Sequence, residues 1–204
     1  MNKKSNNHTK PLGGIIVISA PSGAGKTSVC SAIVKSSRSI VYSISYTTRC
    51  PRQGEKNGRE YFFVDESEFK KMIEEKKFAE WAKVHGNYYG TSKDLLDSVL
   101  KTRRNILLEI DVQGGINIKK QYPQACMIFI MTPDIKTLEK RLTARDKDCK
   151  KIINVRLNNA KKELKYLNKY EYLVINKQLN ETIDTVKTII KSLEYKIEKN
   201  QKYF

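Results

Sequence analysis

The residues with the clearest chemistry lie near the N-terminus, in the glycine-containing loop 20–27 that follows an apolar run and precedes a helical pattern. That setting is typical of a phosphate-binding P-loop. Gly23 and Gly25 allow backbone N–H groups to surround phosphate oxygens, where a side chain would block the approach. Lys26 reaches the β- and γ-phosphates of a nucleotide, and the Thr27 hydroxyl suits Mg²⁺. The predicted triphosphate site is Ala20, Pro21, Ser22, Gly23, Ala24, Gly25, Lys26 and Thr27, with Thr27 as the metal ligand.

Two acids end an apolar strand that the sequence predicts over residues 105–110. Glu109 is the next-to-last residue of this run, and Asp111 is the first residue after it. Because acids at the carboxyl end of a strand lie near the phosphate loop in such sheets, we interpret the run as a Walker-B strand. The alternative is an ordinary strand that ends in a solvated acid. Only Ala20 departs from the usual P-loop pattern, which has glycine there.

Strands and helices alternate along most of the chain, and this pattern positions the two motifs. Strands are predicted at 14–20, 40–46, 105–110, 125–131 and 173–175. Helices are predicted at 26–36, 93–102, after Gly115, from 133–134, and at 148–167 and 181–198. Such alternation predicts an α/β fold with a parallel sheet flanked by helices. The segment from about 42 to 89 interrupts it with short strands, a helix at 67–77, a loop at 49–59 and a turn at 86–90, which indicates an insertion.

The chain carries a net charge of +17, with 39 Lys and Arg against 22 Asp and Glu. A basic protein of this kind can bind nucleic acid. Lysine, however, is spread over every polar helix face, which favours solvated surfaces of biased composition. Arginine is scarce and forms two clusters, at 49–59 and 141–156. Because forked guanidinium groups match phosphate oxygens, these clusters are the informative part of the charge.

Other kinds of chemistry find little support in the sequence. The four cysteines lack metal-binding spacing, and His8 and His85 do not indicate a catalytic triad. Apolar runs are of strand length and far too short to span a membrane. Residues 1–11 are predicted to be a disordered tail, and no secretory signal follows the first lysines. We therefore expect a cytoplasmic protein that binds neither membranes nor nucleic acid.

Several further motifs occur in a recognisable order. They are Ser45-Tyr46-Thr47-Thr48-Arg49, Pro51-Arg52, Gly54-Glu55, Asn57-Gly58, Tyr61, Glu80-Trp81-Ala82, the stretch 86–91, the stretch 110–114, and Arg156-Leu157. With the P-loop they resemble the guanylate kinase family over nearly all of the chain beyond residue 12. The resemblance implies a P-loop NTPase-type sheet with an inserted GMP-binding subdomain at about 42–91 and a short helical lid at about 142–160. The rest of the domain is then 12–41 and 92–200.

The resemblance also implies a site for the acceptor nucleotide. In the family, two arginines and two tyrosines hold the GMP phosphate, and other polar residues read the guanine. Glu80 is suited to this, because a carboxylate accepts from both the N1–H and the N2 amino group of guanine, whereas adenine offers neither donor. Glu55 is expected to orient an arginine. The implied GMP-binding residues are Ser45, Arg49, Arg52, Glu55, Tyr61, Glu80, Tyr89, Thr91 and Asp111.

The lid and the adenine side match the family less closely. Arg141, Arg145 and Arg156 stand where the family places phosphate-clamping arginines. Asn176 matches the adenine-side asparagine of the ATP site, but Lys177 replaces the usual aspartate. In the lid itself, residues 145–149 replace an Arg-Gly-x-Asp-Ser stretch and two lysines follow.

The resemblance implies transfer of the ATP γ-phosphoryl group to GMP, and to dGMP as well, with Mg²⁺ required. The residues expected to share the transition-state charge are Lys26, Arg52, Arg141, Arg145 and Arg156. Three alternatives remain: a kinase for another nucleoside monophosphate, a non-catalytic guanylate-kinase-like binding module, and a nucleic-acid binder. The sequence gives no oligomeric state.

Overall fold

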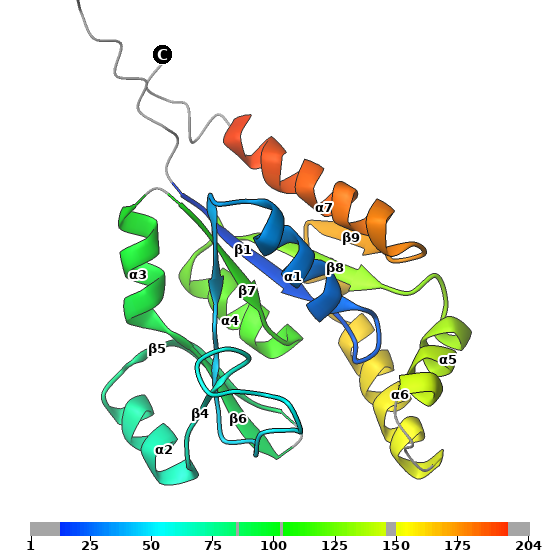
Figure 1. The fold of residues 1–204 in the computed structure, drawn as a ribbon, viewed down its shortest axis with the longest axis horizontal. Coiled ribbons are helices and arrows are strands. Elements are labelled where there is room, and N and C mark those ends of the chain that lie inside the picture. The colour runs from blue at the N-terminus through cyan, green and yellow to red at the C-terminus, as the bar shows by residue number, and fades with distance from the viewer. Residues whose placement is uncertain (1–12, 85, 103, 146–149, 196–204) are drawn as a thin grey trace, which may run out of the picture.

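A five-stranded parallel sheet forms the centre of the molecule (Figure 1). The computed structural model describes residues 13–84, 86–102, 104–145 and 150–195. The strands of this sheet, in spatial order, are β2 (Ile40–Ser43), β7 (Asn105–Glu109), β1 (Ile15–Ser19), β8 (Cys126–Met131) and β9 (Tyr172–Ile175). Strands β1 and β8 are buried at every residue, as expected of central strands covered on both faces.

Helices cover both faces of this sheet, as the alternating pattern predicted. Helices α1 (Lys26–Ser36) and α7 (Leu179–Ser192) pack on one face, where Ile16 and Ile18 lie in the same apolar cluster as Val186. Helices α3 (Lys93–Lys101) and α4 (Val112–Gln121) pack on the other face, against Ile15 and Val17. The alternation of strand side chains thus supplies a separate core to each face.

The segment that interrupts the alternation forms a second sheet, which lies with α2 (Glu66–Glu74) at one side of the first (Figure 1). Its strands, in spatial order, are β4 (Phe62–Phe63), β3 (Tyr46–Thr47), β6 (Asn87–Ser92) and β5 (Phe78–Val84). Aromatic side chains form its core, with the rings of Phe69 and Phe78 stacked at 4.5 Å. Such pairs stabilise small sheets beyond their buried area.

Two predicted elements in this region differ from the structure. The single strand expected at 40–46 is divided, since β2 joins the first sheet and β3 the second. The turn expected at 86–90 is confined to its start, where Gly86 has a φ of 85°, and strand β6 follows it. Buried and less buried residues alternate from 43 to 47, so the pattern does not reveal where the chain passes from the first sheet to the second.

Helix α4 begins before Gly114 and Gly115, whereas the sequence predicted a helix only after Gly115. It starts at Val112, because the side chain of Asp111 caps it by accepting hydrogen bonds from the N–H groups of Gln113 (3.2 Å) and Gly114 (3.1 Å). Such a cap stabilises a helix by about 1 kcal/mol, comparable with the cost of one helical glycine. Gly114 and Gly115 therefore lie inside the first turn.

Helices α5 (Ile135–Arg145) and α6 (Lys150–Leu164) lie together beside the loop that joins β1 to α1 (Figure 1). Leu138 and Leu142 of α5 share an apolar cluster with Ala24 of that loop. Short 3₁₀ helices at Leu167–Lys169 and Leu193–Tyr195 follow α6 and α7, and they end the helices before the predicted boundaries. The predicted tail 1–11 and residues 196–198 of the last predicted helix lie outside the described residues. In the described part of the chain, no helix is long and apolar enough to cross a membrane.

Candidate active site

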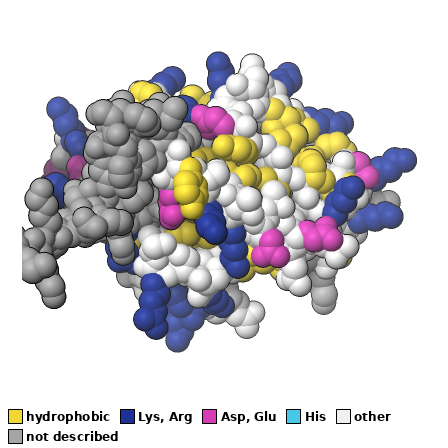
Figure 2. All heavy atoms as spheres, turned by 90° about the horizontal axis from the view of Figure 1, so that it is seen from above, with side chains coloured by type: hydrophobic (Ala, Val, Ile, Leu, Met, Phe, Trp, Pro, Cys, Tyr) yellow, Lys and Arg dark blue, Asp and Glu magenta, His cyan; other side chains and the backbone are white. Residues whose placement is uncertain are grey.

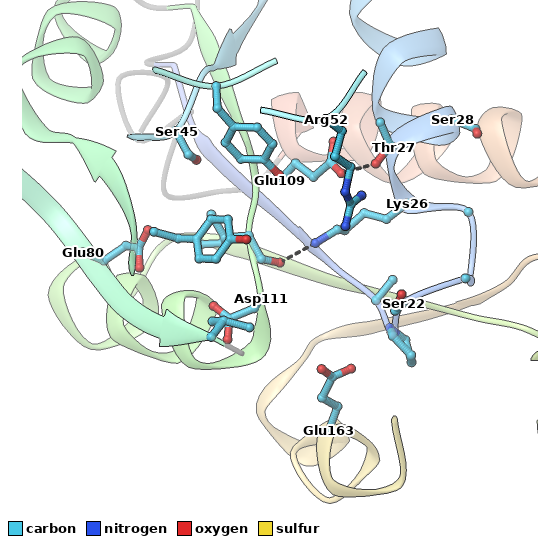
Figure 3. Close-up of a pocket in the computed structure, with 18 residues that line it drawn as sticks. Ser22, Lys26, Thr27, Ser28, Ser45, Arg52, Glu80, Glu109, Asp111 and Glu163 are labelled. Atoms are coloured by element: carbon cyan, nitrogen blue, oxygen red, sulfur yellow. Dashed lines mark hydrogen bonds between the residues drawn. The ribbon is translucent and has the colours of Figure 1, made fainter. Parts of the chain in front are cut away.

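A cavity of about 380 Å³ opens between the two sheets, at the carboxyl ends of β1 and β7 (Figure 3). Four regions far apart in the sequence contribute to its wall: the P-loop, the second sheet with its loops, the end of β7, and helix α6. The lining residues are Ala20, Pro21, Ser22, Gly23, Gly25, Lys26, Thr27, Ser28, Ser45, Arg52, Tyr61, Glu80, Val84, Tyr89, Glu109, Ile110, Asp111 and Glu163.

The loop 20–27 adopts the backbone shape that its glycines require. Gly23 and Gly25 have φ values of 88° and 94°, in the left-handed region that disfavours other residues. Lys26 begins α1, and its Nζ atom donates a hydrogen bond to the carbonyl oxygen of Ile110 at 3.0 Å. This bond holds the ammonium group at the end of β7, within the cavity. The backbone N–H groups at the start of α1 and the Lys26 ammonium together form a site for anions.

A buried asparagine fixes the loop from behind. The Nδ2 atom of Asn176 donates to the carbonyl oxygen of Ala24 at 2.7 Å, and its Oδ1 atom accepts from Thr182 Oγ1 at 3.0 Å. A Cβ atom at position 25 would lie 2.5 Å from Asn176 Nδ2, so glycine is needed there for close approach as well as for its φ. Asn176 is 3% exposed and lies outside the cavity lining. Its predicted contact with adenine stays a prediction, and the structure adds a role in holding the P-loop.

Thr27 and Glu109 form a pair of oxygen groups beside Lys26. Thr27 Oγ1 donates to Glu109 Oε1 at 2.6 Å, and Tyr42 donates to Glu109 Oε2 at 2.9 Å. Hydroxyl and carboxylate oxygens suit Mg²⁺, which usually takes one or two protein ligands together with phosphate oxygens. Within the described residues, no group of three or more His, Cys, Asp or Glu side chains is placed to hold a metal alone. The pair therefore fits a metal ion that arrives with a nucleotide.

Arginine side chains and phenol rings form a second anion site opposite the P-loop. Arg52, Tyr61 and Tyr89 line the cavity. Arg49 lies behind them, with its Nη2 atom 2.9 Å from both Glu55 oxygens and its guanidinium 5.4 Å from the centre of the Tyr61 ring. Glu55 also accepts the Arg52 N–H at 2.7 Å. Burial alone would raise the pKa of Glu55, but these hydrogen bonds and the arginine charge lower it.

A buried carboxylate lies at the far end of the cavity. Glu80 is 6% exposed, and its Oε1 atom accepts a hydrogen bond from Thr91 Oγ1 at 2.6 Å. Burial raises the pKa of Glu80 to about 7; the Thr91 hydrogen bond opposes this, and the charge of Asp111 adds to it. Ser45 lies near this end of the cavity as well (Figure 3). The site can therefore offer an acceptor to a ligand that brings N–H donors.

The model of the guanylate kinase family matches residues 13–193 of the chain. The chain belongs to the guanylate kinase family. Guanylate kinase of Dechloromonas aromatica is 43% identical over 88% of this chain and 89% of its own length. That of Fusobacterium nucleatum is 44% identical over 89% and 97%. The crystal structure of guanylate kinase from Anaplasma phagocytophilum has a TM-score of 0.80 and 31% identity, covering 93% of this chain and 90% of its own. The predicted family and fold class are thereby confirmed.

Of the three arginines predicted to clamp phosphates, Arg141 and Arg156 lie outside the cavity lining. Arg141 donates from Nη2 to the carbonyl oxygen of Asn176 at 3.0 Å, and Arg156 lies on α6. The side chain of Arg145, at the end of α5, lies outside the described residues. Their predicted contacts with phosphate stay predictions.

The predicted site left out five lining residues: Ser28, Val84, Glu109, Ile110 and Glu163. Of these, Glu109 and Ile110 belong to the strand interpreted as Walker-B. Glu163 is the most informative of these, because it is a charged side chain on α6. Its Oε2 atom is shielded from solvent and has no hydrogen-bond partner in the structure. Burial raises its pKa to about 7; the charge of Lys26 opposes this, and that of Asp111 adds to it. Its spacing of seven residues from Arg156 places both on one helix face, and this was the available signal.

Proposed function

We propose that the protein transfers the γ-phosphoryl group of ATP to GMP, giving ADP and GDP, and that dGMP is also an acceptor. The single observation that supports this best is the shared cavity, in which the P-loop lysine Lys26 and the guanidinium of Arg52 face one volume of about 380 Å³. Two anion sites in one cavity fit a reaction between two phosphate groups. Membership in the guanylate kinase family supports the same conclusion.

The reaction needs positioning and positive charge more than it needs a base. The acceptor is a phosphate oxygen that is ionised at neutral pH, so no side chain must remove a proton from it. Lys26 and Arg52 line the cavity and supply charge at the P-loop and at the facing wall. We propose that Arg141, Arg145 and Arg156 add charge when α5 and α6 close over ATP. Closure would also exclude the water that otherwise hydrolyses ATP.

Thr27 is the proposed ligand for Mg²⁺, together with the nucleotide phosphates. The ion, when bound, neutralises charge on the donor phosphates. Glu109 Oε1 holds the Thr27 hydroxyl at 2.6 Å and so fixes its direction. The binding of ATP phosphates at 20–27 and the contact of Asn176 with the adenine side belong to the same proposal.

Glu80 is the proposed reader of guanine. As a carboxylate it would accept the N1–H and N2 donors of the base. The hydroxyl group of Thr91 donates to its Oε1 atom at 2.6 Å and holds the carboxylate in place. Adenine would leave this buried acceptor unpaired, and such an unpaired group can discriminate by roughly 10⁴-fold. The GMP phosphate would contact Arg52, Tyr61 and Tyr89, with Arg49 and Glu55 behind them. Ser45 and Asp111 complete the proposed GMP site.

The division of the chain belongs to the proposal as well. Residues of about 42–91 would hold GMP, about 142–160 would form the lid, and the remainder of 12–200 would bind ATP. We propose a cytoplasmic enzyme with ATP and GMP as its substrates. On the face shown in Figure 2, Lys and Arg side chains form several separate groups with acidic side chains between them. That distribution favours solvated surfaces over a continuous nucleic-acid groove.

A coupled assay for ADP, run with GMP, AMP, CMP and UMP as acceptors, tests the proposal. We expect turnover with GMP at least a thousandfold above AMP, and loss of turnover in Lys26→Ala. Lys35→Ala, an exposed lysine at the other end of α1, is the matched control. If Lys26→Ala formed ADP as fast as the wild type, the proposed kinase activity would be excluded. GMP binding without ADP formation in the wild type would support the binding-module alternative.

A further inference from the structure

Glu163 is a carboxylate in the wall of the cavity that the proposed mechanism leaves unused. It lies near the end of α6, and its side chain points toward Ser22 and Lys26 (Figure 3). Its Oε2 atom is shielded from solvent and accepts no hydrogen bond. A carboxylate that has lost water without gaining a partner is unfavourable in the ligand-free protein. An acid in this position is understandable if a ligand brings it a donor.

The groups that a pair of nucleotides brings into the cavity limit the choice of donor. Phosphate oxygens carry negative charge, and a carboxylate repels them. The guanine edge offers N–H groups, but these are directed to Glu80, which lies at the other end of the cavity from Glu163 (Figure 3). The amino group of adenine is also a donor, but Asn176, the residue proposed for the adenine side, lies outside the cavity lining. Within the cavity, two donors remain: the hydroxyl groups of a sugar and the water molecules bound to a metal ion.

The position of Thr27, the proposed metal ligand, decides between a sugar hydroxyl and a metal-bound water as the donor to Glu163. Thr27 and its partner Glu109 lie on one side of the Lys26 side chain, and Glu163 lies on the other (Figure 3). Asp111, by contrast, lies between Glu80 and Glu163, close enough for its charge to act on both. If the base of a nucleotide is held at Glu80, its sugar therefore lies past Asp111, in the direction of Glu163.

Asp111 itself is less available for the sugar. Its Oδ1 atom accepts the N–H of Gly114 and its Oδ2 atom that of Gln113, because it caps α4. Among these acids, Glu163 alone has a buried oxygen without a partner.

We propose that the Glu163 carboxylate accepts a hydrogen bond from a sugar hydroxyl of the acceptor nucleotide. The inference rests on the proposed function, since it assumes a guanine nucleotide held at Glu80. It makes Glu163 a specificity residue for the sugar, on the helix pair that would close over the site. Binding of the acceptor would then be linked to the position of α6.

The test compares GMP with 2′,3′-dideoxy-GMP in the wild type and in Glu163→Ala. Loss of a hydrogen bond to a charged acceptor should lower kcat/KM for GMP about tenfold to hundredfold. The dideoxy nucleotide has no hydroxyl to donate, so the same substitution should change its kcat/KM less than threefold. The 2′-deoxy and 3′-deoxy analogues then assign the hydroxyl. Calorimetric Kd values for GMP should change in parallel with KM.

Two further variants keep the test independent of folding and of the proposed function. Glu163→Gln keeps the shape and removes the unpaired charge, so its melting temperature should equal or exceed that of the wild type. Glu139→Ala, an exposed acid on α5, should leave both substrates unchanged. An equal loss with GMP and the dideoxy analogue, or a loss seen only in KM for ATP, would overturn the role of Glu163. A wild type without GMP turnover would instead overturn the proposed function.

Discussion

A Cβ atom on Gly114 would lie 2.6 Å from the Oε2 atom of Glu80 and 3.1 Å from its Cδ atom. No side chain fits at position 114 while the carboxylate keeps its place. Gly114 lies in the first turn of α4, where its N–H group donates to the Asp111 cap. Position 114 therefore requires glycine, because the Glu80 carboxylate of strand β5 approaches it closely.

Gly114→Ala should weaken the acceptor site selectively. The added methyl group displaces the Glu80 carboxylate, so KM for GMP should rise about tenfold or more while KM for ATP changes little. Alanine also favours the helix by about 1 kcal/mol relative to glycine, so the fold should persist. Steady-state kinetics with each substrate varied separately measures the effect.

The double variant Gly114→Ala with Glu80→Asp serves as the control. Aspartate is one methylene shorter, which restores space beside the new methyl group. In the Glu80→Asp background, the alanine should therefore raise KM for GMP much less than in the wild type. Fully additive effects would show that crowding of Glu80 is not the cause.

Glu80 should also make the ligand-free protein sensitive to pH. Burial raises its pKa from an ordinary value of 4.5 to about 7 in the folded state. The folded protein therefore holds a proton between these values that the unfolded chain has lost, and its stability falls as the pH rises through this window. Glu80→Gln removes the part of this dependence that Glu80 contributes, while Glu163, whose pKa burial also raises to about 7, contributes equally in both proteins. The free energy of unfolding, measured in urea at pH 5 and pH 8, should favour the variant increasingly at the higher pH.

The same pKa should govern binding of GMP. A protonated Glu80 offers one acceptor fewer to the guanine N–H groups, so KM for GMP in the wild type should rise as the pH falls below 7. In Glu80→Gln, KM should be high at every pH, and its remaining pH dependence should come from Glu163 and from the GMP phosphate, whose second pKa is about 6. A wild-type KM that stays constant from pH 5.5 to 8 would contradict the role of the carboxylate.

Local patterns were enough to predict the family, the parallel sheet and the P-loop, because each depends on residues close in sequence. The apolar run 14–20 and Gly23 and Gly25 are of this kind, and the family and the fold are confirmed. The passage of the chain between sheets at 43–46 was not predictable, since strand periodicity is the same in both sheets.

The roles of residues that act through contacts between distant parts of the sequence were also not predictable. Asn176 was predicted for the adenine side, but its hydrogen bond to Ala24 O joins positions 152 residues apart. Gly114 was expected to precede the helix predicted after Gly115, and its contact with Glu80 was not predictable because it depends on how α4 packs against the second sheet. Glu163 carried no motif of its own. The contacts of bound nucleotides with all predicted site residues stay predictions.

Glu55 should affect GMP binding through Arg49, the arginine that it holds. Its carboxylate binds the guanidinium of Arg49 and the N–H of Arg52 at once. Glu55→Gln should release Arg49 and raise KM for GMP about fivefold to thirtyfold, with kcat affected less, because the lost contact fixes the acceptor phosphate. Glu60→Gln is a matched control in the same loop, since Glu60 pairs with the exposed Arg59. Equal KM values for the two variants would contradict the prediction.

Tyr42 should tune the metal requirement through Glu109. Its hydroxyl group donates to Glu109 Oε2 at 2.9 Å, while Oε1 holds Thr27. Tyr42→Phe removes that donor, so Glu109 can turn away from Thr27. We expect kcat to fall about threefold to tenfold and the Mg²⁺ concentration for half-maximal rate to rise, with KM for GMP unchanged. Tyr172→Phe, on the opposite edge strand β9, is the control. A change in KM for GMP alone would place Tyr42 in the acceptor site instead.

Asn176→Ala should reduce both stability and ATP binding, because one buried side chain holds the P-loop to α7. The substitution leaves Ala24 O and Thr182 Oγ1 without the partner that each has now. Two buried polar groups that lose a hydrogen bond cost about 2–4 kcal/mol together, less what Thr182 recovers through its bond to Gln178 O at 2.9 Å. Urea unfolding measures this loss, and calorimetry should show Kd for ATP raised about tenfold. Lys177→Ala, the exposed neighbour, should change stability by less than about 0.5 kcal/mol. If Asn176→Ala matched that control in both measurements, the asparagine would not be what keeps the phosphate loop in shape.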